Sequence, residues 1–175
     1  MANYVSLITD DTWKSIWARH QELRLQFPLH ENRTPFLPIA EAGFGHPDCW
    51  SITFCGIAAG EVQNVDEDLN IAVATMAEEF GGRHQADWRT HQGKHNFWPE
   101  IASICAIISE QPDARPLRVG WANILPISES PKPPTQKLAK AQYEIARAVL
   151  SDLMVPMCAQ VFVGTFGQAN FPLHK

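Results

Sequence analysis

Several features that would assign this chain to a class are missing from its sequence. No run of apolar residues reaches the length of about eighteen that a membrane-crossing helix needs. The first residues lack the basic and apolar segments of a secretory leader. The four cysteines are scattered and form no CxxC pair, which argues against a zinc or iron–sulfur site of that type. We therefore expect a cytoplasmic protein with buried free thiols, without membrane contact, metal or cofactor.

An excess of positive charge is missing as well. The formal net charge is −5, which argues against a protein that grips nucleic acid through charge alone but leaves room for a local basic face. The P-loop, the complete GxGxxG fingerprint and the GxSxG elbow are absent, which removes the commonest nucleotide-binding and esterase classes. With 175 residues, 45% of them hydrophobic, the chain fits a single domain over residues 1–175.

The apolar pattern that is present alternates between strands and helices. Three-and-four spacing from Trp13 to Phe27, preceded by capping candidates such as Thr9, predicts a first helix. Residues 27–47 show little periodicity, so residues 1–49 are expected to form a helix and an irregular loop. Buried strands are then expected at 52–55, 118–122 and 160–163, and helices at 65–80, 97–108 and 136–154. This order predicts an α/β fold of three layers (αβα) with a short central parallel sheet.

The apolar run that begins at Ser51 ends in glycine and alanine. Gly56 is expected to start a tight turn, and small residues as far as Gly60 would let the backbone pass close to a guest molecule. Asn123 and Gly164 follow the two other strands. Because the carboxyl ends of parallel strands meet at one edge of a sheet, the three ends could floor one pocket. Its substrate-binding candidates are Gly56, Ile57, Ala58, Gly60, Asn123 and Gly164.

Asn123 is the most specific of these candidates. Its amide donates and accepts hydrogen bonds in a fixed pattern, as reading the Watson–Crick edge of a base requires. Phe54, Trp121 or Phe166 could supply a surface on which the base stacks. Taken alone, an asparagine after a strand more often caps or turns the chain, so that interpretation stays open.

Three segments, in order, resemble motifs of the uracil-DNA glycosylase superfamily. Residues 56–61 are similar to its Gly-x-x-Pro-Gly segment, residues 119–126 resemble its uracil-reading strand, and residues 161–164 are similar to the strand that follows. The resemblance covers roughly residues 50–167 and implies a uracil-DNA glycosylase-like core there. It also implies a DNA partner, single- or double-stranded, with a flipped base read by Asn123.

The chain departs from the family where water is activated. The family carries an acid or amide at one of the two places after the first glycine, and this chain has Ile57 and Ala58. Hydrolysis would then fall to Glu61 or Asp66, or be absent. Glu61 is the catalytic candidate, because its negative charge could stabilise an oxocarbenium-like sugar. Alternatively, Glu61 is only a residue at the start of a helix, where a negative charge is favourable. The family's closing His-Pro-Ser loop has no counterpart after Gly167.

One polar stretch, residues 83–95, concentrates basic and histidine side chains around a tryptophan. Arg83, Arg89 and Lys94 are candidates for phosphate contacts, and Trp88 could stack on an unpaired base. A solvated loop is the simpler interpretation of the stretch. A metal site through His91 and His95 is the remotest one, because Gly93 weakens the helix that would align them.

These observations favour a DNA-repair protein that binds a deaminated or damaged base in DNA, with hydrolysis of the N-glycosidic bond as its activity if it is an enzyme. Two other classes stay open. One is a catalytically inactive nucleic-acid- or protein-binding module on the same scaffold, and the other is a hydrolase of small nucleotides or glycosides.

Overall fold

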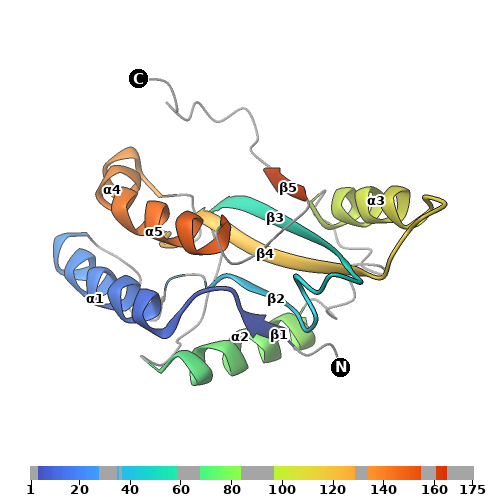
Figure 1. Ribbon diagram of the computed structural model, residues 1–175. Coiled ribbons are helices and arrows are strands. Elements are labelled where there is room, and N and C mark those ends of the chain that lie inside the picture. Colours follow the sequence, from blue (N-terminus) through green and yellow to red (C-terminus); the bar gives the residue numbers. More distant parts are fainter. Residues whose placement is uncertain are drawn as a thin grey trace.

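A five-stranded mixed sheet organises the computed structural model, with the strands in the order β1-β2-β4-β3-β5 (Figure 1). The structure describes residues 4–27, 35, 37–58, 68–83, 97–128, 134–154 and 161–164. The strands are β1 (Tyr4–Ser6), β2 (Ile39–Glu41), β3 (Trp50–Ala58), β4 (Leu117–Leu125) and β5 (Val161–Gly164).

The central part of the sheet is parallel. Strand β3 lies between β4 and β5 and pairs with both in parallel, so that Cys55 is opposite Ala122 on one side and Gly164 on the other. The strand that begins near Ser51 is therefore the middle one of the three strands that the sequence predicted. The three carboxyl ends lie at the same edge of the sheet, as expected.

The remaining two strands, which the sequence did not predict, make the sheet mixed. Strand β2 pairs antiparallel with β4, and β1 pairs antiparallel with β2. The prediction of an irregular loop over residues 27–47 is wrong at Ile39–Glu41, which form the buried strand β2. Both added strands have three residues, too few for an alternating pattern to stand out.

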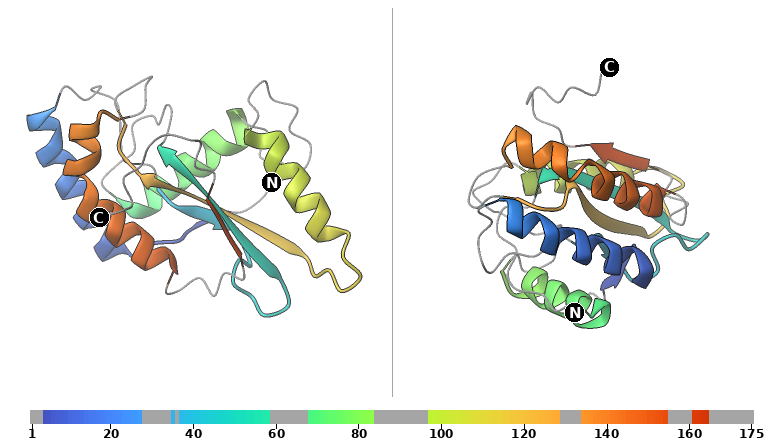
Figure 2. Two further views of the ribbon diagram at one scale, coloured as in Figure 1. Left: turned by 90° about the horizontal axis from the view of Figure 1, so that it is seen from above. Right: turned by 90° about the vertical axis from the view of Figure 1, so that its left-hand side faces the viewer.

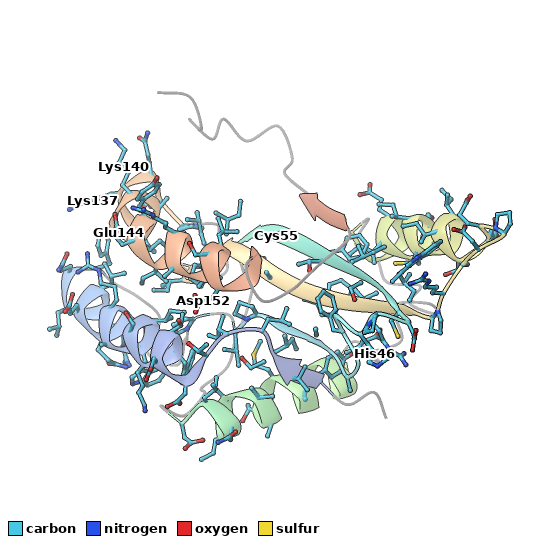
Figure 3. The ribbon with its side chains drawn as sticks, viewed as in Figure 1. His46, Cys55, Lys137, Lys140, Glu144 and Asp152 are labelled. Atoms are coloured by element: carbon cyan, nitrogen blue, oxygen red, sulfur yellow. The ribbon has the colours of Figure 1, made fainter. Side chains whose placement is uncertain are left out.

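Five helices flank the sheet: α1 (Asp10–Gln26), α2 (Leu69–Arg83), α3 (Phe97–Ser109), α4 (Gln136–Ala141) and α5 (Tyr143–Met154). Helices α1 and α5 lie side by side on one side of the strands, and α2 and α3 lie on the other side (Figure 2). Thr12 of α1 donates a hydrogen bond to the carboxylate of Asp152 on α5 (Figure 3). The sheet is thus covered on both faces, which agrees with a three-layer arrangement.

The first helix forms as its sequence predicts. Thr9 is its N-cap and accepts a hydrogen bond from the backbone N–H of Thr12 at 3.2 Å. Its apolar face buries Trp13, Ile16 and Leu23 against the core. Helix α3 also follows its predicted range closely.

Two helix predictions need correction. Helix α2 starts at Leu69 and continues through the glycines at 81 and 82, where the sequence predicted its end. Residues 136–154, predicted as one helix, form α4 and α5 with a break at Gln142. No helix in the described part of the chain is both long enough and apolar enough for a bilayer crossing.

Candidate functional site at the carboxyl edge of the parallel strands

The residues predicted to end the strands lie inside them. Gly56 pairs with Asn123, and the ladder continues to Ala58 opposite Leu125. The expectation that Gly56 starts a tight turn is therefore wrong, as is the expectation that Asn123 follows the end of its strand. Both residues sit near the carboxyl edge, within two residues of it.

Gly56 makes room for the side chain of Asn123. A Cβ atom placed on Gly56 would come within 2.5 Å of Oδ1 of Asn123, closer than any real side-chain contact. The two residues are direct register partners on parallel strands, and such partners project from the same face of a sheet. The amide of Asn123 therefore lies directly over the bare backbone of Gly56, and this close approach is what requires a glycine there.

Asn123 makes no side-chain hydrogen bond within the part of the chain that the structure describes. The residue is 9% exposed. An amide at the edge of a sheet that has no partner in the described residues is available to a ligand or to water. The arrangement leaves one acceptor and two donors available at the edge of the sheet.

An aromatic pair lies two residues before Gly56 and Asn123, on the same face of the sheet. The rings of Phe54 and Trp121 stack with their centroids 5.6 Å apart and an interplanar angle of 28°. Phe54 is 1% exposed and Trp121 is 4% exposed. Both rings are therefore part of the core beneath the amide, and neither is exposed as the predicted stacking surface would be. Phe166, the third stacking candidate, lies outside the described residues.

Cys55 lies beside Gly56 on strand β3 and projects from the opposite face of the sheet (Figure 3). Its thiol contacts the carbonyl oxygen of Gly56 at 3.7 Å. Burial raises the pKa of this thiol from 9.0 to about 12. The group is a protonated thiol at neutral pH and has no nucleophilic character there.

The other predicted site residues are placed as follows. Ile57 and Ala58 continue strand β3, and Gly164 ends strand β5 one register step from Gly56. Arg83 is the last residue of helix α2. Five candidates, Gly60, Glu61, Trp88, Arg89 and Lys94, lie outside the described residues. The structure thus brings together Gly56, Asn123 and Gly164.

Two buried polar side chains near the site were missed from the sequence. Oε2 of Glu41 accepts a hydrogen bond from the backbone N–H of Val119 at 3.0 Å. Gln142 accepts one from the N–H of Ile127 at 3.0 Å and donates one to its carbonyl oxygen at 2.8 Å. A signal for Gln142 exists in the sequence, because it occupies a core position of the helical pattern Leu138, Gln142, Ile145, Val149.

The described residues contain no cluster of three or more histidine, cysteine, aspartate or glutamate side chains that could hold a metal ion. His91 and His95 lie outside them. In comparisons with protein-family models, with curated proteins and with solved structures, none matches this chain. Function is therefore inferred from the residues at the strand edge.

Proposed function

We propose that this protein binds a flipped base in DNA through Asn123, in the manner of the uracil-DNA glycosylase superfamily that its motifs resemble. The observation that carries the proposal is the position of the Asn123 amide, which lies over Gly56 at the edge of the sheet without a hydrogen bond to the described part of the chain. An amide in a fixed place pairs with a base edge that offers one donor and one acceptor, as uracil does.

Three further features support the proposal. The sheet order puts β3 between two parallel neighbours, so Gly56, Asn123 and Gly164, one residue from each segment that resembles the family, lie at one edge. Ligands of open α/β sheets bind at this edge. The core below the amide is apolar and closely packed, which makes hydrogen bonds to Asn123 strong and water competition weak. Arg83, Trp88, Arg89 and Lys94 are the proposed contacts to the DNA backbone and to unpaired bases.

The second candidate function is binding without hydrolysis. It is favoured by Ile57 and Ala58, which continue strand β3 at the two positions where the family carries a water-activating acid or amide. The nearby Cys55 cannot replace them, because its high pKa keeps it protonated. Glu61 is the proposed acid if hydrolysis occurs.

A binding and single-turnover experiment tests the proposal. The probes are single- and double-stranded oligonucleotides that differ only in one uracil or cytosine. We expect the wild-type protein to prefer uracil, and Asn123→Ala to reduce this preference by about tenfold or more, since one to two hydrogen bonds to the base are lost. Asn123→Asp, which keeps the size but loses both donors, is expected to act in the same direction.

Asn70→Ala is the matched control, because Asn70 is an exposed asparagine on α2. Its preference should equal that of the wild type. Release of free uracil would identify the protein as a glycosylase, and stable binding without release would identify a binding module. A wild-type protein that does not distinguish the two probes contradicts the proposal.

A further inference from the structure

Buried side chains form hydrogen bonds with the backbone on both sides of Asn123. Upstream, Glu41 holds the backbone N–H of Val119. Downstream, Gln142 holds both backbone groups of Ile127. Glu41 is 5% exposed and Gln142 is 0% exposed. The two attachments lie four residues before and four residues after Asn123 in the chain.

The downstream attachment lies beyond the described pairs of β3 and β4. The parallel ladder between β3 and β4 ends at Ala58 and Leu125, and Pro126 follows. Ile127, two residues beyond the ladder, is 1% exposed, so its N–H and C=O groups would be costly to leave without partners. The side-chain amide of Gln142 forms a hydrogen bond with each of these two groups, as the backbone of a neighbouring strand would.

Gln142 is suited to this task by its place between two helices. It is the C-cap of α4, with φ −98° and ψ 13°, and its N–H bonds to the carbonyl oxygen of Leu138. On the same helical face Leu138, Ile145 and Val149 are buried apolar side chains. An apolar residue would fill this position at lower desolvation cost, so the amide is explained by its two bonds to Ile127.

We propose that Gln142 is a positioning residue for the base-reading amide. By fixing Ile127, it fixes the direction in which β4 leaves the sheet, and this holds the side chain of Asn123 over Gly56. Gln142 itself lies beneath the strand and does not touch the ligand. For its effect on ligand binding, the inference rests on the proposed function; the coupling between Gln142 and Asn123 in the free protein does not.

The test uses Gln142→Met, which keeps an unbranched side chain of similar size and removes both hydrogen bonds. The matched control is Gln111→Met, because Gln111 also donates to a backbone carbonyl, that of Ile107 at 2.9 Å, but is exposed and remote at the end of α3. Two quantities are measured: the NMR resonances of the Asn123 side-chain NH2 group in the free protein, and the preference for uracil over cytosine oligonucleotides.

We expect Gln142→Met to shift or broaden the Asn123 NH2 resonances and to lower the uracil preference about tenfold, with little change in affinity for the cytosine probe. The control should change neither. If Gln142→Met does not fold, Gln142→Glu serves instead: it keeps the acceptor for the N–H of Ile127 and loses the donor, and it should shift the same resonances by a smaller amount.

Unchanged Asn123 resonances in a folded Gln142 variant would overturn the inference, as would a wild-type preference in that variant. A wild-type protein without any uracil preference would instead refute the proposed function. In that case the NMR measurement still decides whether Gln142 positions Asn123.

Discussion

At the scale of single residues, the contact between Gly56 and Asn123 is the feature most sensitive to a small change. An alanine at position 56 would place its methyl group 2.5 Å from Oδ1 of Asn123. The neighbouring atom is the end of a side chain, so the amide can rotate away while the backbone stays in place. We expect Gly56→Ala to fold but to lose the uracil preference by about tenfold, as Asn123→Ala does.

A double-mutant cycle on the same binding assay checks this explanation. If the methyl group acts by displacing the amide, Gly56→Ala should have no further effect once Asn123 has been replaced by alanine. Additive losses in the double variant would show that Gly56 acts independently of Asn123.

The sequence predicted that Gly56 and Asn123 lie close together at one edge of the sheet, and it placed Gly56 wrongly in a turn. Asn123 could be selected because an amide directly after an apolar run is unusual and chemically specific. Gly56 was assigned to a turn, because glycine is most often a turn residue and the sequence does not show which side chain lies across the sheet. Only the register between β3 and β4 reveals that this glycine accommodates an amide.

At the scale of secondary-structure elements, β4 depends on a carboxylate from β2. The antiparallel register pairs Ile39 with Trp121 and Ala40 with Gly120, and at the next step the side chain of Glu41 reaches the N–H of Val119. Val119 is 0% exposed, so removal of this acceptor leaves a buried donor. We expect Glu41→Ala to lower the free energy of unfolding by about 1–3 kcal/mol, measured by urea denaturation.

Two variants make this measurement specific. Glu41→Gln keeps an oxygen that can accept from Val119 and should cost clearly less than Glu41→Ala. Glu22→Ala removes an exposed carboxylate paired with Arg19 and should cost no more than about 1 kcal/mol. Equal losses for all three would mean that the buried hydrogen bond contributes nothing particular to β4.

Element length decided which elements the sequence could predict. Helices α1 and α3 span several turns, so their apolar faces repeat often enough to be recognised. Strands β1 and β2 have three residues each and carry no such repeat. The break between α4 and α5 escaped prediction because no glycine or proline marks it; at the break, Gln142 forms hydrogen bonds with Ile127, a contact that the helical pattern does not reveal.

At the scale of the whole molecule, the core thiol of Cys55 links stability to alkaline pH. Burial raises its pKa in the folded state to about 12, against 9.0 as the ordinary value. Above pH 9 the unfolded chain therefore loses this proton while the folded protein keeps it, and the stability must fall as the pH rises from 9 to 12. The contribution of Cys55 to this fall is at most about 1.4 kcal/mol per pH unit.

Chemical denaturation of the wild type and of Cys55→Ala between pH 7 and pH 11 measures this contribution. We expect the wild type to lose stability more steeply than the variant above pH 9, and the two to have parallel profiles below it. Parallel profiles over the whole range would contradict the burial of a protonated thiol in the folded core.

The global architecture was predictable in its parallel part and not at its edge. Alternation of strands and helices, with the preference for right-handed crossovers, was enough to predict that β3, β4 and β5 are parallel. The antiparallel edge of β1 and β2 was not foreseen, because residues 27–47 show little periodicity and the pairing of β2 depends on contacts with β4, which is distant in the chain. Those contacts include the hydrogen bond between Glu41 and the N–H of Val119, which the sequence alone does not reveal.

The register that joins Gly56 to Asn123 also sets when the site can appear during folding. The two residues are far apart in the chain, because helices α2 and α3 lie between β3 and β4 in the sequence. Closing so long a loop is slow, since its entropy is lost before any contact compensates for it. A newly made chain can therefore hold well-formed helices before Asn123 lies over Gly56, and the proposed base binding would then report that the sheet is complete.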